Sequence, residues 1–357
     1  MIERRSSPAS QAHLSPCVAV VIPCYRVAQH IVGVINRIPE LIDLIYVVDD
    51  CCPEASGELV EKSCTDGRVK VVYRRKNGGV GAAMVSGYRA ALEDGADIIV
   101  KIDGDGQMPP ELIPLFVGAI ASGQADYAKG NRFFNFASLS GMPSLRLLGN
   151  AVLSFISKAT SGYWDVMDPT NGFTAIDSEA LRLLPLDKVE PRYFFENDML
   201  FRLGTLRAVV RDIPMDAVYA DEESSMRIGR VLVEFPGKFL NRILKRIVYN
   251  YFLRDFNAAS VQLLSGLMLL AVSAGYGVHW IFEYAARGEA APFGMVMVPA
   301  IAAILGFQLL LAAVSIDISS VPREPISTVI RRRRMLLRGE EGAEDHARET
   351  QSKIVNL

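Results

Sequence analysis

Two long uncharged apolar segments in the C-terminal third constrain the fold of this chain more than any other feature. They run from residue 258 to 282 and from residue 292 to 316, and neither contains Asp, Glu, Lys or Arg. At about 1.5 Å of helix rise per residue, each can cross the ~30 Å hydrocarbon core of a bilayer. Soluble domains rarely bury helices that are this long and apolar on all sides. We therefore expect two transmembrane helices.

The short connection between these segments, EYAARGEAA, predicts a helical hairpin whose outer ends lie on the same side of the membrane. Basic residues precede the first segment and follow the second, whereas the turn carries only Arg287. Cytoplasmic flanks of membrane helices carry an excess of Lys and Arg. The sequence thus predicts an integral protein of the inner or plasma membrane, with the rest of the chain and both termini in the cytoplasm.

Residues 15 to about 130 alternate between strand-like runs, such as CVAVVIPCY and ADIIVKID, and helix-like runs, such as GVGAAMVSGYRAALEDG. This alternation is typical of an α/β domain with a mainly parallel sheet. Ligands of such sheets bind outside the carboxyl ends of the strands. Pro23, the pair Asp49–Asp50 and the pair Asp103–Asp105 all stand at such ends. The pattern predicts a binding site along this rim.

The composition excludes some classes of protein. The formal net charge is −2 and no basic face is evident, so a nucleic-acid partner is not expected. The five cysteines form no CxxC pair, which favours reduced thiols. The polar N-terminus lacks the apolar core of a signal peptide, and we interpret residues 1–15 as a disordered tail.

The segment VKIDGDGQMPP indicates the chemistry at the rim. Asp103, Asp105 and Gln107 occupy alternate positions, so their side chains converge where the segment stays extended. Gly104 and Gly106 between them leave room for a ligand. A few oxygens from one segment hold Mg²⁺ or Mn²⁺ only when water and substrate phosphates supply the other ligands. We interpret the segment as a site for a metal ion and a diphosphate.

Four segments resemble the family 2 glycosyltransferases of the GT-A fold: VAVVIPCY, YVVDD, NGGVGAAMVSGYRAAL and IIVKIDGDGQMPPELIP. More narrowly, DxDxQ before PPELI, a later GNR and C-terminal membrane helices are similar to polyprenyl-phosphate sugar transferases. These include dolichol-phosphate mannose synthases and bacterial undecaprenyl-phosphate glucosyltransferases. The resemblance covers about residues 17 to 255. It implies an inverting transferase that moves a hexose from a UDP- or GDP-linked sugar to undecaprenyl or dolichyl phosphate, for cell-surface glycan or glycoconjugate synthesis.

The resemblance also implies roles for individual residues. Asp103, Asp105 and Gln107 would take the metal and the diphosphate, with Asp105 catalytic and Asp103 also contacting the donor. The remaining donor residues would line the nucleotide pocket: Pro23, Tyr25, Asp49, Asp50, Asn77, Gly79 and Gly81. The sequence departs from the family at Arg26–Val27 and at Cys51–Cys52, both of which face the nucleotide in the family. The identity of the base therefore stays open.

The acceptor side needs cations, because a lipid phosphate is already anionic and must be positioned rather than deprotonated. Arginine suits this task because its donors form a planar fork. The candidates for the acceptor phosphate and pocket are Lys129, Arg132, Arg146, Asn171, Ser225 and Arg227, with Arg132 preferred. The segment FFENDML offers Glu196 and Asp198; Asp198 matches the family's base position better, and the choice between them stays open.

These features predict the following organisation. A GT-A domain covers residues 16–226, amphipathic interfacial helices cover 227–256, the two transmembrane helices lie within 257–317, and a charged cytoplasmic tail covers 318–357. Within the interfacial stretch we expect apolar side chains such as Phe235, Phe239 and Leu240 to face lipid. We expect Lys238, Arg242, Lys245 and Arg246 to attract an anionic leaflet. Assembly with further copies of the chain stays open.

Two other functions compete with this interpretation. One is a processive polysaccharide synthase of the same fold, but such enzymes carry a QxxRW segment, and neither Trp164 nor Trp280 lies in one. They also use more membrane helices. The other is a catalytically silent membrane scaffold that binds a nucleotide sugar, against which the complete set Asp103, Asp105 and Gln107 argues.

Overall fold

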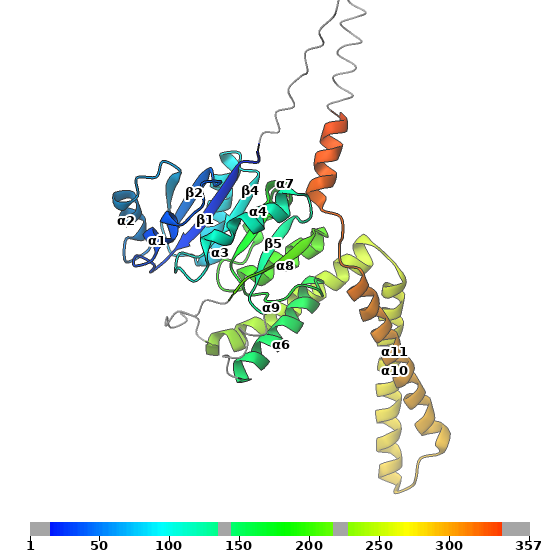
Figure 1. Ribbon diagram of the computed structural model, residues 1–357. Coiled ribbons are helices and arrows are strands. Elements are labelled where there is room, and N and C mark those ends of the chain that lie inside the picture. The colour runs from blue at the N-terminus through cyan, green and yellow to red at the C-terminus, as the bar shows by residue number, and fades with distance from the viewer. Residues whose placement is uncertain (1–14, 135–143, 217–227, 338–357) are drawn as a thin grey trace, which may run out of the picture.

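The computed structural model describes residues 15–134, 144–216 and 228–337. A seven-stranded sheet runs in the order β3-β2-β1-β4-β6-β5-β7 (Figure 1). Strands β1 to β4 pair in parallel, as do β5 and β7, whereas β6 is antiparallel to both β4 and β5. The expected mainly parallel α/β sheet is therefore confirmed. The strands are β1 (Val18–Cys24), β2 (Leu44–Asp49), β3 (Val69–Tyr73), β4 (Ile98–Lys101), β5 (Tyr127–Asn131), β6 (Thr174–Asp177) and β7 (Val210–Pro214).

Helices cover both faces of the sheet because the central strands are apolar on both sides. Val20 and Ile22 of β1 belong to the core under α1 (Ile31–Asn36), α2 (Ser56–Ser63) and α4 (Ile113–Ala121). Ala19 and Val21, at the alternate positions, belong to the core under α3 (Val80–Glu93), α7 (Ser178–Arg182) and α8 (Phe195–Leu206). Short 3₁₀ turns span Pro110–Leu112 and Leu186–Lys188.

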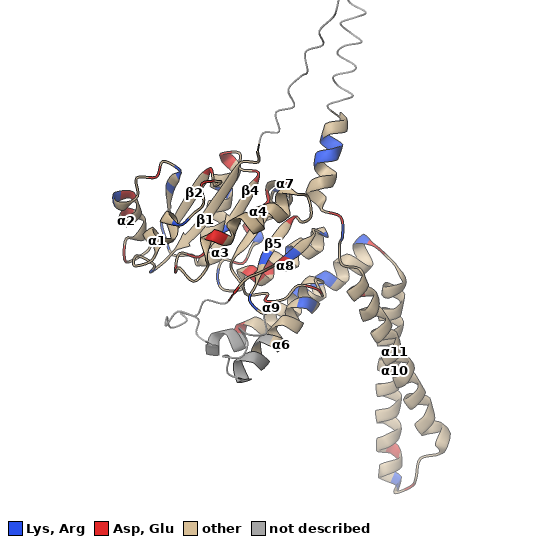
Figure 2. Cartoon of the chain, viewed as in Figure 1, with Lys and Arg blue, Asp and Glu red and all other residues tan. Residues whose placement is uncertain are grey.

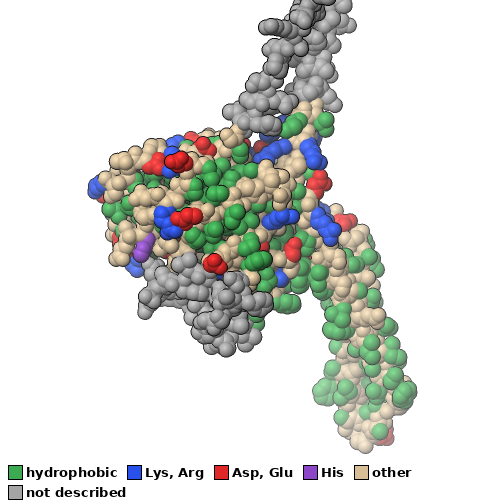
Figure 3. All heavy atoms as spheres, viewed as in Figure 1, with side chains coloured by type: hydrophobic (Ala, Val, Ile, Leu, Met, Phe, Trp, Pro, Cys, Tyr) green, Lys and Arg blue, Asp and Glu red, His purple; other side chains and the backbone are tan. Residues whose placement is uncertain are grey.

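The two apolar segments form a hairpin of long helices, α10 (Ala258–Arg287) and α11 (Phe293–Ser319). Their mean hydropathy reaches 1.7 and 2.3, and both are long and apolar enough to cross a membrane. Figures 2 and 3 show the hairpin projecting from the α/β domain, with charges near its turn and apolar side chains along its length. The helices approach closely where Gly266 faces Gly306, since a Cβ on either would lie 3.0 Å from the other's carbonyl oxygen. The side chains that the hairpin exposes suit lipid rather than water.

Helix α9 (Ile228–Val248) lies beside α6 (Ser144–Ser161) and continues into a π-helical turn, Tyr249–Arg254, before α10 (Figure 1). The expectation that Phe235 and Phe239 face lipid is wrong. Both are buried, 8% and 4% exposed, and they pack edge to face against Phe194 at the start of α8. An aromatic cluster with the α/β domain buries these rings more completely than a bilayer surface would.

The basic side chains of α9 also differ from expectation. Lys238 donates to Glu190 at 2.7 Å, and Arg242 donates to Asp198 at 2.7 Å. Arg246 is 4% exposed and paired with Asp317 at 2.7 Å. Of the four predicted leaflet contacts only Lys245 is exposed. The charges of α9 thus hold it to the protein, while the exposed side chains Leu240, Leu244 and Val248 form an apolar stripe.

Asp317, near the end of α11, joins the hairpin to the rest of the molecule. Its carboxylate accepts hydrogen bonds from Trp164 Nε1 at 2.7 Å, from Arg246 and from the Tyr251 hydroxyl. These donors come from the loop after α6, from α9 and from the π-helical turn. The two outer ends of the hairpin are therefore tied to the same part of the α/β domain.

The chain then returns to the α/β domain as a helix over residues 326–337. The buried carboxylate of Asp126 accepts from the backbone N–H groups of Ile326 at 2.9 Å and Ser327 at 2.8 Å, and thereby caps this helix. Arg331 pairs with the buried Asp177 at 2.5 Å. The first part of the predicted tail is consequently folded onto the α/β domain, where β5 begins and β6 ends. The predicted N-terminal tail falls almost wholly outside the described residues.

Candidate active site

The polar rim begins where β4 ends. Asp103 and Asp105 follow the last residue of β4, Lys101, and both are partly exposed. One oxygen of Asp105 accepts from the backbone N–H of Gln107 at 3.0 Å, which keeps the segment turned. Gly106 has φ +79°, a backbone conformation that residues other than glycine rarely adopt. The alternation of carboxylates therefore ends in a tight turn that brings Gln107 back beside Asp105.

Lys101 is a fully buried cation within this rim. Its ammonium donates to Asp103 Oδ1 at 2.7 Å and to the carbonyl oxygen of Gly172 at 3.1 Å, and it lies 3.4 Å from Glu196 Oε1. Burial lowers the pKa of Lys101, but the two carboxylates more than offset this, and the pKa lies above its ordinary value. Burial likewise raises the pKa of Glu196, and the Lys101 ammonium counteracts part of the increase.

The donor set at the rim fits a divalent ion that shares its ligands with a substrate. No three His, Cys, Asp or Glu side chains gather into a metal site within residues 15–134, 144–216 and 228–337. The protein thus supplies two neighbouring carboxylates, Asp103 and Asp105, and the amide of Gln107. Mg²⁺ and Mn²⁺ bound by one or two carboxylates complete their shells with phosphate oxygens and water. A metal held here would therefore have coordination positions open to diphosphate oxygens and water.

Asp49 and Asp50, at the end of β2, are buried and hold loops. The Asp49 carboxylate accepts from the backbone N–H groups of Cys52 at 2.7 Å and Gly57 at 2.8 Å. The Asp50 carboxylate accepts from Gly78 and Gly79 and is paired with Arg74. Both carboxylates thus shape the turns that surround the rim. The predicted contact of Asp49 or Asp50 with a base or ribose stays a prediction, and it would be made in addition to these hydrogen bonds.

The glycine turn before α3 is shaped by its neighbours. Gly79 has φ +93°, and a Cβ at Gly81 would lie 2.1 Å from the carbonyl oxygen of Glu190. Asn77 donates to the carbonyl oxygen of Asp50 at 3.3 Å. Glycine is required here because the turn packs directly against the backbone of residues 190–191.

The two segments that depart from the family pattern, Arg26–Val27 and Cys51–Cys52, contact each other. The backbone N–H of Arg26, which has φ +59°, donates to Cys52 Sγ at 3.1 Å. Cys51 also has a positive φ, +55°. Pro23, the last but one residue of β1, is partly buried, and Tyr25, next to Arg26 in the chain, is 43% exposed. All five cysteines are free, as expected.

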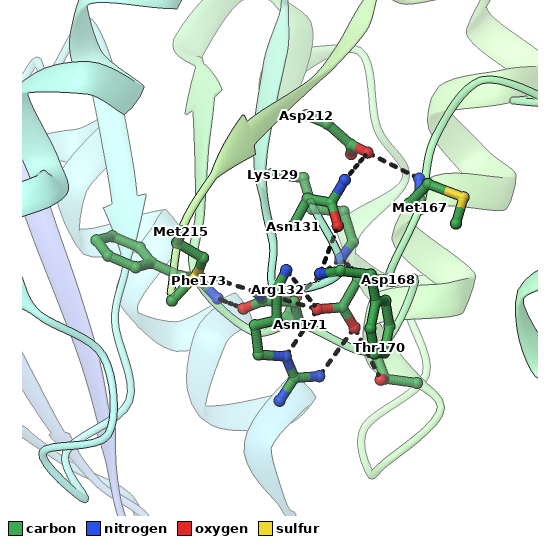
Figure 4. A network of polar contacts seen from close by, with 11 residues as sticks. Lys129, Asn131, Arg132, Met167, Asp168, Thr170, Asn171, Phe173, Asp212 and Met215 are labelled. Carbon is green, nitrogen blue, oxygen red and sulfur yellow. Dashed lines mark hydrogen bonds and ion pairs between the residues drawn. The ribbon is translucent and has the colours of Figure 1, made fainter. Parts of the chain in front are cut away.

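Asp168 organises the acceptor-side residues, and the sequence analysis did not single it out. Its fully buried carboxylate accepts two hydrogen bonds from the Arg132 guanidinium, at 2.7 and 2.8 Å (Figure 4). Burial alone would raise the pKa of Asp168, but Arg132 and Lys129 hold it below its ordinary value. A bidentate pair fixes the plane of the guanidinium. Arg132 is therefore oriented, and its side chain stays 36% exposed at the rim.

Lys129 does not lie at the surface. Its buried ammonium donates to the carbonyl oxygens of Asp168 and Asn171, and burial lowers its pKa to about 8. Asn171 is buried too, and its side-chain oxygen accepts from Phe173 at 3.0 Å. Both residues shape the turn 168–172. Their contact with an acceptor phosphate stays a prediction.

Residues 19–184 match the family model described as Glycosyl transferase family 2. This part of the chain is a family 2 glycosyltransferase domain. The seven-stranded sheet with helices on both faces is the GT-A-like fold that the resemblance implied. The chain is accordingly a glycosyltransferase.

Two curated relatives of this glycosyltransferase are polyprenyl-phosphate sugar transferases by name. Undecaprenyl-phosphate mannosyltransferase of Micrococcus luteus is 28% identical over 61% of this chain and 90% of its own. UDP-N-acetylglucosamine–dolichyl-phosphate N-acetylglucosaminyltransferase of Methanococcus voltae is 29% identical over 64% of this chain and 94% of its own. Among solved structures, glucosyl-3-phosphoglycerate synthase of Mycobacterium tuberculosis with UDP has a TM-score of 0.48 at 20% identity, over 65% of this chain and 80% of that one.

The catalytic-base candidates of the glycosyltransferase occupy different environments. Asp198 is fully buried and accepts from Arg202 at 2.8 Å and Arg242 at 2.7 Å, one on each oxygen. It is the centre of an ion-pair network between α8 and α9, which does not suit a base. Glu196 instead lies beside Lys101 at the rim. A buried acid with two arginine partners is visible only once α8 and α9 are packed together.

Some predicted acceptor residues lie outside the described residues. Ser225 and Arg227 belong to the stretch 217–227, and the side chain of Arg146, on α6, is likewise not described. Asp212 on β7 is a further charged residue that the sequence analysis missed. It accepts from Asn131 at 3.0 Å and from Met167 N at 2.8 Å (Figure 4). Burial raises its pKa to about 6.

Proposed function

We propose that this glycosyltransferase moves a hexose, with inversion, from a nucleoside-diphosphate sugar to a membrane polyprenyl phosphate such as undecaprenyl or dolichyl phosphate, in the synthesis of cell-surface glycans. The observation that carries the proposal is the juxtaposition of two polar groups at one rim. Lys101, which contacts Asp103 and Glu196, donates to Gly172 at one end of the turn 168–172, and the oriented guanidinium of Arg132 is paired with Asp168 at its other end. The names of the relatives in Micrococcus luteus and Methanococcus voltae support the same acceptor class.

In this proposal, different residues bind the donor diphosphate and the acceptor phosphate. Asp103, Asp105 and Gln107 would hold Mg²⁺ or Mn²⁺, which when bound neutralises charge on the departing diphosphate. Arg132 binds the acceptor phosphate and orients one of its oxygens toward the anomeric carbon. That oxygen is anionic at neutral pH, so attack needs no strong base. Glu196, rather than Asp198, is the carboxylate placed to contact the sugar or to relay a proton.

The membrane hairpin brings the rim to its lipid substrate. The polyprenyl tail stays in the bilayer, so its phosphate reacts only close to the surface. We place the catalytic domain and both ends of the hairpin in the cytoplasm, because basic residues flank the outer ends. The contact of Arg246 with Asp317, which joins both ends of the hairpin to one domain, supports this common side.

Transfer of radiolabel tests the proposal. The full chain in detergent is incubated with Mn²⁺, a panel of UDP- and GDP-linked sugars and undecaprenyl phosphate. We expect label in organic-extractable lipid with at least one donor, and loss of this label in an Asp105→Asn variant that still folds. Label in a long water-soluble polymer would indicate a processive synthase instead. Binding of a nucleotide sugar with no turnover would indicate a silent scaffold.

A further inference from the structure

Lys101 is the one fully buried charged side chain that contacts two carboxylates of the rim within the described part of the chain. A lysine at the end of an apolar strand is costly to bury unless its charge is paired. Methionine would fill the same space without that cost. The charge of Lys101 therefore calls for an explanation beyond packing.

The ammonium joins three segments that are far apart in the sequence. It binds Asp103 on the segment after β4, the Gly172 carbonyl on the turn 168–172, and Glu196 in the first turn of α8. Asp103 is a proposed metal ligand, and Gly172 lies in the turn next to the proposed acceptor site. Glu196 is the carboxylate that we propose contacts the sugar. One cation thus sets the spacing of all three.

The fit around this cation is tight. A Cβ on Gly172 would lie 2.3 Å from Lys101 Nζ and 2.6 Å from Asp103 Oδ2. Among the residues that the structure describes, the other buried ammonium near Glu196 is that of Lys129, which is already bound to carbonyl oxygens of Asp168 and Asn171. Without Lys101, Asp103 and Glu196 would repel each other with no cation between them.

We propose that Lys101 is a positioning residue of the transfer reaction: it holds Asp103, Glu196 and the turn at Gly172 in the arrangement that the transition state requires. The inference rests on the proposed function, because it assigns the work of Lys101 to that site. Lys101 touches neither donor nor acceptor in this account. It acts through the two carboxylates, so its loss affects turnover rather than the binding of metal.

The test compares Lys101→Met with the parent in three measurements on the full chain in detergent. We expect kcat to fall about 100-fold, the cost typical of misplaced groups. Binding of Mn²⁺ in the presence of UDP or GDP, measured by electron paramagnetic resonance of free Mn²⁺, should be no weaker than in the parent, because a positive charge has been removed. The melting temperature should stay within a few degrees of the parent's.

Parent-like kcat in Lys101→Met would overturn the inference, as would loss of Mn²⁺ binding in proportion to loss of activity. Lys70→Met is the matched control, since Lys70 is an exposed lysine paired with Asp94 away from the rim, and it should keep full activity. If Lys101→Met does not fold, Lys101→Gln removes the same charge and keeps an amide that can donate to the Gly172 carbonyl, and it should also lower kcat without weakening Mn²⁺ binding. Unchanged kcat in that variant would equally reject the inference.

A double variant tests whether Lys101 acts through Glu196. If it does, Lys101→Met combined with Glu196→Gln should be less than about threefold slower than the slower single variant. Multiplication of the two single effects would contradict the proposed route. The parent protein tests the proposed function separately. If the parent consumes the donor sugar without labelling lipid, the lipid acceptor is rejected. The rate of donor consumption by Lys101→Met relative to that by the parent would still test the role of Lys101.

Discussion

At the residue scale, the acceptor side of the rim depends on geometry as well as charge. Arg132 is held by both oxygens of Asp168, so its guanidinium presents a fixed plane. We expect Arg132→Ala to slow transfer at least 100-fold and Arg132→Lys to recover only part of it, because lysine lacks the two-pronged geometry. Steady-state rates with undecaprenyl phosphate measure this. A lysine variant as fast as the parent would reduce Arg132 to a general positive charge.

A second residue-scale prediction concerns Asp212, whose pKa is raised by burial to about 6. This folded-state pKa lies above the unfolded-state pKa of about 3.9. The contribution of Asp212 to the free energy of unfolding is therefore fully present below pH ~4, and it is lost as the pH rises through 6. The loss amounts to about 2–3 kcal/mol. About half of this loss falls between pH 5 and pH 7, so Asp212→Asn should raise the melting temperature relative to the parent by about 3 °C more at pH 7 than at pH 5. An equal difference at both pH values would contradict this.

At the element scale, α9 exposes an apolar stripe, and Lys245 is the one of its four predicted leaflet-binding residues that is exposed as well. Leu240, Leu244 and Val248 are 58%, 54% and 49% exposed, and the last two also line an apolar hollow of about 560 Å³ against α8. We expect the stripe to insert into the bilayer surface, so replacement of all three by Gln should lower kcat/KM for long polyprenyl phosphate at least tenfold. A short water-soluble prenyl phosphate should react as with the parent. Equal loss on both acceptors would reject the role of the stripe.

The ion pairs of α9 supply the control for this element. Arg242→Gln leaves the buried Asp198 with one guanidinium partner, and it should lower the melting temperature by several degrees. High salt should change transfer by the parent little, because Lys238, Arg242 and Arg246 are engaged by the protein itself. Strong inhibition by salt would restore the electrostatic account of membrane attachment.

At the scale of the whole molecule, the segment after the hairpin fastens the membrane part to the sheet. Arg331 pairs with Asp177, which is fully buried, whereas its neighbour Arg332 pairs with the exposed Glu324. Removing Arg331 leaves a buried carboxylate without its cation. Arg331→Gln should destabilise the protein by about 1–3 kcal/mol, and Arg332→Gln by less than about 0.5 kcal/mol. Thermal unfolding in detergent compares them, and equal effects would show that the docked helix adds little stability.

The sequence by itself determined the features that depend on local pattern. Alternating apolar runs gave the α/β sheet, uncharged length gave the hairpin, and strand ends gave the rim with Asp103 and Asp105. Each follows from periodicity or from the rule that loops at strand ends carry the site. These features are properties of one segment at a time, so they can be derived before the chain is folded.

Only the tertiary structure decided which partner each charged side chain takes. Lys129 and Lys101 look alike in sequence, yet one holds a turn and the other joins two carboxylates. The basic residues of α9 fit a membrane surface by composition, but in the folded chain they pair with Asp198 of α8 and with Glu190 of the loop before it. The physical reason is that an ion pair depends on distance and burial between segments far apart in the chain. Tertiary packing sets this distance and this burial, and the local sequence pattern predicts neither of them.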